Sequence, residues 1–457
     1  MKMIQSIRDM VKNKLYRNIT VLAGGNLLAQ IVNVLSAPVL SRLFSLEEFG
    51  AYAIFTSIYA IAVIFMNGKY EMAIIVEEDE RMAGVLLKTC ILFSLAALVP
   101  AVLLVSVYLR TTTLGNGDTT EFMCLLFASV VLGNAVHTLS RYLNRFGRYN
   151  SVSVSAVLYT LSYTALSIVL KVMWNVQNSM LYGYAFSTAV QAVFLFFSTW
   201  RKTPLRSAKA QWKDMLYLLK KHIRFPLYSA PSDAMNTLST QIPVLLMTNL
   251  FGMQAAGAYG MANRIVGLPV AIMGSSVGTV YFTDASKAHH AGDMETLRKM
   301  TRDIGEKLLY MALVPMTLLM LYGKQLFMWV LGDKWAEAGQ MAQGLAFWML
   351  FVFVASPITG IWNVLRKQHL SLLVNAILLV SRTASIVLGF LVFRSPQPAI
   401  LFFSLTGAMI WIFLHCYNLR LISLPAGRIL LRMAAAITLS VVIIGYPGFL
   451  IHFIRRM

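Results

Sequence analysis

Residues 42–53 read RLFSLEEFGAYA, and residues 249–260 read NLFGMQAAGAYG. The two stretches align without a gap and share five of twelve residues, at an offset of 207 residues. Each stretch covers the end of one apolar segment and the start of the next. The repetition therefore predicts an internal duplication, in which the phrase forms the turn between the first two helices of each half.

The composition of the chain defines its class. Of the 457 residues, 58% are hydrophobic and 13% are charged, and the mean hydropathy is +0.67. A soluble protein carries about a quarter charged residues. The sequence therefore predicts an all-α polytopic membrane protein. The net charge of +20 does not indicate nucleic-acid binding, because the basic residues are dispersed between apolar segments.

Apolar windows of about 20 residues predict twelve core transmembrane helices and one further apolar run. The predicted spans are 19–40, 50–68, 84–109, 121–142, 151–173, 178–200, 225–250, 256–283, 303–323, 338–365, 369–393 and 397–419, with the last run at 433–454. Six spans precede a basic stretch and six follow it. Because six is even, both halves have the same orientation, which predicts two parallel-repeat six-helix bundles.

The predicted division of the chain follows from these spans. It comprises a basic amphipathic N-terminal segment 1–18, an N-terminal bundle 19–200, a cytoplasmic basic linker 201–224, a C-terminal bundle 225–420 and an extra hydrophobic segment 421–457. With the N-terminus in the cytoplasm, the inner segments carry 29 of the 39 Lys and Arg residues, and the outer ones carry 8. This asymmetry predicts that orientation.

The final apolar run leaves two interpretations open. As a span it would place Arg455 and Arg456 outside, against the charge asymmetry. We also expect Gly445, Pro447 and Gly448 to interrupt it. The run 433–454 is therefore either a thirteenth span or a re-entrant or peripheral segment.

The first span of each half carries a polar stripe. Asn26, Gln30 and Asn33 lie on one helix face, and the offset of 207 residues places Asp233, Thr237 and Thr240 at the equivalent positions. Asn236 and Gln241 widen the second stripe. Because polar side chains avoid lipid, paired stripes predict a central polar cavity between two bundles that alternate in access. The alternative is that these residues join helices through hydrogen bonds.

Two arginines fall inside predicted spans, Arg264 in the eighth and Arg382 in the eleventh. Asp233 is the one acid well inside a predicted span, and a single acid cannot neutralise both. An anionic ligand such as a phosphate would satisfy the remaining charge. Arg42 and Lys69, near span ends, either extend this basic surface or snorkel to the membrane interface.

Asp233 has two candidate roles. It either pairs with Arg264 or Arg382 as a gate, or it binds a coupling ion, a proton or sodium, because desolvation makes a buried carboxylate titratable. The sequence indicates no metal site and no cofactor. Its three cysteines lie singly in apolar segments, at positions 90, 124 and 416, and no phosphate-binding P-loop motif is present.

Two longer stretches, APVLSRLFSLEEFGAYAIF and GKYEMAIIVEEDERMAGVLL, resemble the N-terminal signature of bacterial polysaccharide (O-antigen, Wzx-type) flippases. These flippases belong to the multidrug/oligosaccharidyl-lipid/polysaccharide exporter superfamily. The segment from FPLYSAPSDAMN to GTVYF is similar to the family's seventh and eighth helices, and LNRFGRYN also fits. The resemblance covers roughly residues 15 to 420.

The resemblance implies a flippase, not an enzyme, in the bacterial cytoplasmic (inner) membrane. Its substrate would be an undecaprenyl-diphosphate-linked oligosaccharide for surface polysaccharide, with membrane lipids and the polysaccharide polymerase machinery as further partners. Among relatives, cationic cavity residues in helices one, two and eight matter, and only Arg264 matches the helix-eight position well.

Three other functions stay open. Within the superfamily, the alternatives are a cation-coupled multidrug exporter and a peptidoglycan-precursor flippase. From a different class, the alternative is a membrane glycosyltransferase or polymerase. The short predicted outer loops, which lack clustered acids or histidines, argue against the last.

Overall fold

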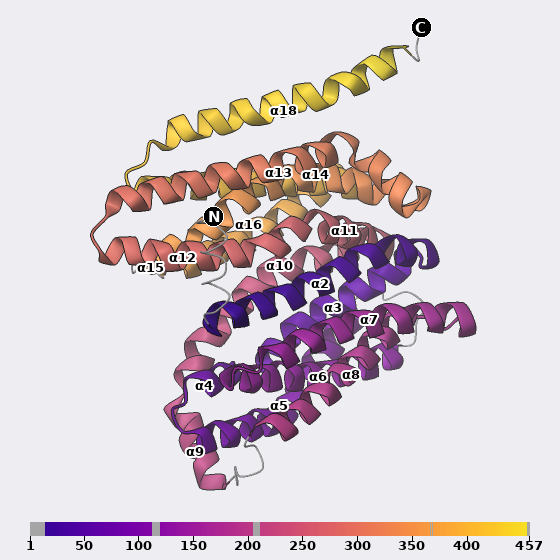
Figure 1. Ribbon diagram of the computed structural model, residues 1–457. Helices are drawn as coiled ribbons and strands as arrows, with labels where there is room; N and C mark the ends of the chain where they lie inside the picture. Colours follow the sequence, from indigo (N-terminus) through magenta and orange to yellow (C-terminus); the bar gives the residue numbers. More distant parts are fainter. Residues whose placement is uncertain (1–13, 112–118, 204–210, 366, 368, 455–457) are drawn as a thin grey trace. The chain divides into compact units, whose positions relative to one another are not determined.

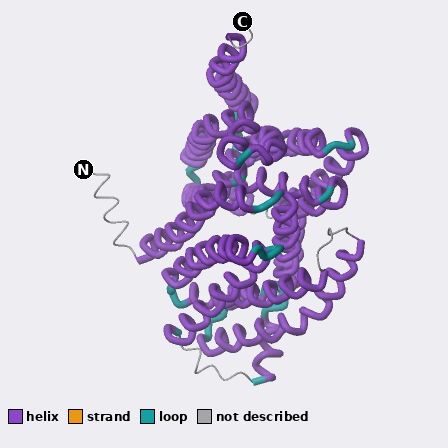
Figure 2. The backbone as a smooth tube through the Cα atoms, turned by 90° about the vertical axis from the view of Figure 1, so that its right-hand side faces the viewer, coloured by secondary structure: helices purple, strands orange, loops and turns teal. Residues whose placement is uncertain are grey.

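The computed structural model describes residues 14–111, 119–203, 211–365, 367 and 369–454. Within these residues every regular element is a helix (Figure 2). The chain divides into two compact units, of which the first ends at Gln241 and the second begins at Ile242. Residues 1–13 of the predicted segment 1–18 lie outside the described residues. Residues 14–18 belong to the first described helix.

The first unit is a bundle of long helices with two short ones beside them (Figure 1). Helix α7 packs against both α2 and α8, and α6 packs against α8. The helices are α2 (Lys14–Leu43), α3 (Leu46–Met66), α4 (Tyr70–Val76), α5 (Glu80–Thr111), α6 (Thr119–Arg145), α7 (Tyr149–Trp174), α8 (Ser179–Lys202), α9 (Trp212–Lys221), the π-helical turn η2 (Phe225–Ser229) and the start of α10 (Ala230–Phe251).

The second unit is built around α14, which packs against α11, α13 and α17. Helix α16 packs against α17. The elements are α11 (Met253–Val266), η3 (Val270–Gly274), α12 (Ser275–His290), α13 (Met294–Leu331), η4 (Asp333–Trp335), α14 (Ala336–Ala355), η5 (Ser356–Gly360), α15 (Ile361–Val364), α16 (His369–Phe393), α17 (Pro396–Leu421) and α18 (Ala426–Ile454).

The repeated phrase forms a helix–turn–helix corner in both places, as predicted. In the first corner, Ser45 caps α3 through a capping box: Glu48 N donates to Ser45 Oγ at 3.1 Å, and Ser45 N donates to Glu48 Oε2 at 2.8 Å. In the second, Gly252 precedes α11 with a φ of +89°. Ser45 and Gly252 lie 207 residues apart and so occupy equivalent positions. The two halves therefore form the same type of corner with different residues before the second helix.

Among the described residues, ten helical segments are long and apolar enough to cross a membrane, and they correspond to ten of the thirteen predicted spans. The other three predicted spans correspond to α2, in which Leu27–Leu43 is a shorter apolar stretch, to α10, and to the pair α11 and α12. Within the predicted span 256–283, a turn at Gly267 and the π-helical η3 separate α11 from α12 next to Pro269. Of these regions, α10 carries the second polar stripe and α11 carries Arg264, and both features lower the apolar character of the helix.

Helix α18 corrects the expectation for the end of the chain. It continues without a break through Gly445, Pro447 and Gly448, and Ala426–Gly445 is long and apolar enough to span a membrane. A helix interior in lipid tolerates a proline where the freed carbonyl finds another partner. Ser440 Oγ lies 2.9 Å from Thr317 Oγ1 of α13, so α18 packs against that helix.

Candidate functional site

The turn between α3 and α4 is fixed against the segment that leads into α10. Tyr70 Oη donates a hydrogen bond to the backbone oxygen of Leu219, at 2.9 Å. Gly68 has a φ of +53°, and a Cβ atom there would lie 3.1 Å from Pro226 Cβ. Glycine is therefore favoured at position 68, both by the left-handed backbone and by the close approach of the η2 turn.

This turn places Lys69 beside two carboxylates. Lys69 Nζ lies 2.9 Å from Asp233 Oδ2 at the start of α10 and 3.6 Å from Glu71 Oε1 in α4. Lys69 has a φ of 65°, in the left-handed region, and its backbone N–H donates to Asn67 Oδ1 at 3.1 Å. Asn67 in turn donates to Asn134 Oδ1 of α6, at 2.6 Å. A polar network thus holds the lysine in position.

The charges of this cluster do not cancel, because two carboxylates face one ammonium. Glu71 is the more enclosed acid, with a side chain 7% exposed, whereas that of Asp233 is 45% exposed. Glu71 Oε2 has no hydrogen-bond partner among the described residues. Asp233 is therefore the carboxylate of this cluster that solvent reaches more easily.

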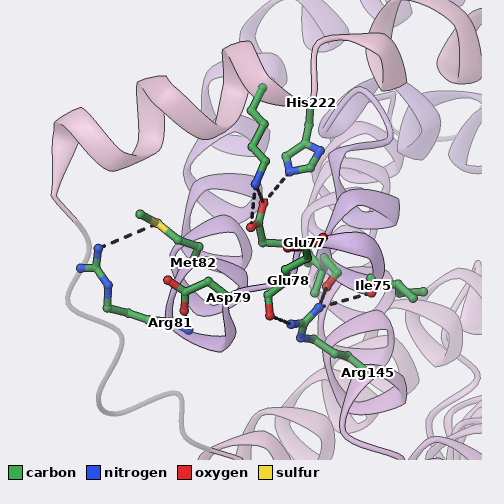
Figure 3. A network of polar contacts seen from close by, with 10 residues as sticks. Ile75, Glu77, Glu78, Asp79, Arg81, Met82, Arg145 and His222 are labelled. Carbon is green, nitrogen blue, oxygen red and sulfur yellow. Dashed lines mark hydrogen bonds and ion pairs between the residues drawn. The ribbon is translucent and has the colours of Figure 1, made fainter.

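A second network anchors the linker helix α9 to the first unit (Figure 3). Glu77, at the end of α4, has a side chain that is 2% exposed. Both of its carboxylate oxygens lie 2.8 Å from Lys221 Nζ, and Oε2 lies 2.7 Å from His222 Nε2. Leu218 of α9 is fully buried in the hydrophobic core beneath, which contains Tyr70.

The ionisation of this network follows from its contacts. Burial opposes the charged form of Glu77, but the hydrogen bonds from Lys221 and His222 outweigh it, and the pKa of Glu77 lies below its ordinary value. The hydrogen bond to Glu77 raises the pKa of Lys221. The carboxylate and the ammonium therefore stay ionised together at neutral pH.

Arg145 of α6 fixes the other side of the same segment (Figure 3). Its guanidinium donates to the backbone oxygens of Ile74, Ile75 and Glu78, at 3.0, 3.3 and 3.1 Å. The carbonyls of Ile74 and Ile75 belong to the last turn of α4 and that of Glu78 lies just beyond it. The last carbonyls of a helix have no partner within the helix. The two networks hold the C-terminal end of α4. They thereby also set the position of its first turn and of Lys69, which directly precedes it.

The polar-stripe residues are found on α2 and α10. Gln30, Asn33, Thr237 and Gln241 are half-buried, Asn236 and Thr240 are exposed, and the side chain of Asn26 lies outside the described residues. Gln241 Oε1 accepts a hydrogen bond from Ser57 Oγ of α3, at 3.0 Å, so at least this residue joins helices. The cavity between two bundles stays a prediction.

The four predicted cations differ in their surroundings. Arg42 is exposed in the last turn of α2, and Arg264 is half-buried in the last turn of α11. Arg382 lies within α16 and is 9% exposed. Its guanidinium carbon is 5.2 Å from the centre of the Trp348 ring of α14, a cation–π contact. Lys69 is the cation that pairs with Asp233.

Sequence reasoning did not find all of these partners. It considered Arg264 or Arg382 for Asp233, whereas the ion pair described here joins Asp233 to Lys69. It also missed Glu71 and the Glu77 network. One signal was present: the Asn-Gly-Lys run at 67–69 is a strong turn sequence that would bring Lys69 back over the end of α3.

The fold defines an all-helical, multi-pass membrane protein within the described residues. A solved inward-facing multidrug resistance MATE family transporter of the MOP superfamily is similar over 87% of this chain and 94% of its own, with a TM-score of 0.68 and 14% identity. The lipid II flippase MurJ, in an inward closed conformation, is similar over 94% of this chain and 99% of its own, with a TM-score of 0.67 and 12% identity.

The family follows from the sequence itself. Residues 39–340 match the family model described as polysaccharide biosynthesis protein, and the chain belongs to that family. The capsular polysaccharide biosynthesis protein CapF of Staphylococcus aureus is 22% identical over 378 residues, which cover 80% of this chain and 89% of CapF. The resemblance to polysaccharide flippases is thus confirmed at the level of the family.

Proposed function

We propose that this protein is a flippase that moves an undecaprenyl-diphosphate-linked oligosaccharide across the bacterial cytoplasmic membrane for surface polysaccharide biosynthesis. Arg382 is the observation that carries the proposal. A charged guanidinium inside a membrane helix costs about 2.5–3.5 kcal/mol by insertion scales, and residues with this cost mark substrate or ion pathways. In a polysaccharide biosynthesis protein, the substrate group that matches a guanidinium is the diphosphate of a lipid-linked sugar.

Arg382 has the chemistry to meet an anionic substrate. Its guanidinium carbon lies 5.2 Å from the centre of the Trp348 ring, a cation–π contact. A guanidinium matches the paired oxygens of a phosphate. In this proposal Arg264 contributes a second cation, and the polar stripes of α2 and α10 accommodate the sugar.

The Lys69–Asp233–Glu71 cluster supports an ion-coupled cycle in the same proposal. Asp233 holds Lys69 at 2.9 Å when it is ionised. Binding of a proton or sodium ion to Asp233 weakens that pair and releases the start of α10 from the α3–α4 turn. A charge change at one residue thus biases the alternating access of the two halves.

Transfer between leaflets in proteoliposomes tests the function. Purified protein is reconstituted with a fluorescent undecaprenyl-diphosphate-linked oligosaccharide, and the label in the outer leaflet is removed chemically over time. We expect transfer above that of protein-free vesicles and no export of a cationic dye. Export of the dye without transfer of the lipid would favour the multidrug exporter instead. Transfer of lipid II alone would favour a peptidoglycan-precursor flippase.

A further inference from the structure

Helix α18 forms one wall of a cavity that the proposed transport pathway does not use. The cavity lies in the second unit, where α13 and α18 begin and α17 ends, and its volume is about 290 Å³. Its polar wall consists of Arg302 and Glu306 of α13, His415 of α17 and Arg432 of α18. Leu309 and Met433 contribute apolar surface to the same cavity.

The two arginines of this cavity keep hydrogen-bonding capacity. Arg432 Nη1 lies 3.9 Å from Glu306 Oε1, and Arg302 Nε lies 3.8 Å from Asp303 Oδ1, so both ion pairs are long. A guanidinium has five N–H donors, and these pairs use few of them. Glu306 lines the cavity and Asp303 does not, so two guanidiniums and one carboxylate face it among the described lining residues.

His415 supplies an independent sign of a ligand. It is 3% exposed and lines the cavity, and its Nδ1 atom has no hydrogen-bond partner among the described residues. Buried polar atoms in proteins are almost always paired. Gly305 faces the imidazole, since a Cβ there would lie 3.8 Å from His415 Cε1. The ring is therefore accommodated but left with one unsatisfied polar atom.

We infer that this cavity binds the headgroup of an anionic phospholipid. The phosphodiester lies between Arg302 and Arg432, His415 completes its hydrogen bonds, and the acyl chains leave along the apolar side of α18. The volume of about 290 Å³ is at the lower limit of small-molecule sites. It is large enough for a phosphoglycerol group but not for a lipid-linked oligosaccharide. On the predicted orientation, the cavity lies at the level of the cytoplasmic headgroups.

Native mass spectrometry of the full-length protein in detergent tests this site. The probes are phosphatidylglycerol, phosphatidylethanolamine and inorganic phosphate, each added separately. The variant Arg302→Gln/Arg432→Gln removes both cations, and Arg420→Gln/Arg428→Gln removes two exposed arginines that do not line the cavity. We expect the first variant to retain phosphatidylglycerol about tenfold less than wild type, and the second to resemble wild type.

Three results would overturn the inference. They are equal retention of phosphatidylglycerol by the two double variants, equal retention of the two phospholipids by wild type, and displacement of phosphatidylglycerol by millimolar phosphate, which would assign the site to the free ion. If the first double variant does not fold, Arg432→Gln decides the question, because that side chain is 76% exposed and its loss leaves the core intact.

Discussion

At the scale of single residues, the charges of this protein fall into two kinds of environment. Arg382 is enclosed among side chains of the second unit and stacks on Trp348. Asp233 and Lys69 form an ion pair in the first unit whose aspartate is 45% exposed. An enclosed cation suits recognition, whereas a reachable acid suits exchange of an ion. The proposed flippase uses the two in these different roles.

Replacing Asp233 with Asn tests the exchange. An amide cannot ionise, so it can neither bind a coupling cation nor attract Lys69 as a carboxylate does. We expect leaflet transfer by Asp233→Asn to become independent of an imposed proton or sodium gradient, and to slow by about 5- to 150-fold, the usual range of a coupling free energy. The measurement is the transfer rate in proteoliposomes with and without each gradient.

Asp284→Asn is the matched control, since Asp284 is an exposed aspartate that pairs with Lys287 at 3.3 Å. It is expected to behave as wild type. If Asp233→Asn responded to the gradients as wild type does, Asp233 would have no part in coupling.

The sequence identified Lys69 and Asp233 as candidate functional residues, but it did not predict that they contact each other. Lys69 and Asp233 were both identified from their positions near span ends or within a polar stripe. Their contact at 2.9 Å depends on Gly68, Pro226 and the hydrogen bond from Tyr70 to Leu219, which join segments about 150 residues apart. Periodicity along one helix contains no information on such pairing.

At the scale of elements, α9 has two different faces. One packs on α4 and α5 through Leu218 and the Glu77 network. The other exposes Trp212, which is 66% exposed, and Leu216. The sequence predicted a basic amphipathic linker here. It did not predict the docking, because the apolar face of an amphipathic helix fits a membrane surface as well as a protein core.

Glu77→Gln tests how strongly the network holds α9. The amide carries no charge, so it loses the charge-assisted hydrogen bonds from Lys221 and His222. We expect faster hydrogen exchange in residues 212–221 of the variant at neutral pH, with little change in the long helices. Glu78→Gln is the control, because the Glu78 side chain is exposed. Equal protection of α9 in both variants would contradict this role.

The same network predicts a pH dependence. The pKa of Glu77 is lowered from its ordinary 4.5, so its stabilisation is present above that value and is lost as the pH falls through the lowered pKa. The pKa of Lys221 is raised from 10.5, so its stabilisation is lost as the pH rises through the raised pKa. Protection of α9, corrected for intrinsic exchange, should therefore decline at both extremes. A decline centred near neutral pH would show that other groups control the docking.

At the scale of the whole molecule, the chain repeats a scaffold while varying its charges. Ser45 and Gly252 make equivalent corners, yet Arg42 has Asn249 as its counterpart and Arg264 has Ser57. The composition and the repeat predicted the helical membrane fold. They could not predict the interruption next to Pro269 in detail, because a proline in a membrane helix produces either a kink or an interruption, depending on its neighbours.

The predicted orientation can be measured directly. Single cysteines at positions 47 and 290, in a variant without the three native cysteines, are treated with a membrane-impermeant maleimide in intact cells. We expect position 47 to react and position 290 to react only after the membrane is opened, because inner segments carry most of the Lys and Arg residues. The reverse pattern would invert the topology.

Leaflet transfer of an undecaprenyl-diphosphate-linked oligosaccharide by wild type, Arg382→Gln and Arg394→Gln tests the central claim most directly. Arg394 directly follows α16, the helix that contains Arg382, and its side chain is exposed. The variant Arg394→Gln therefore controls for the loss of one positive charge. We predict transfer by wild type and Arg394→Gln, and at least about tenfold less by Arg382→Gln, because a charged hydrogen bond to the diphosphate is lost. No transfer by wild type, or equal transfer by all three proteins, would contradict the account.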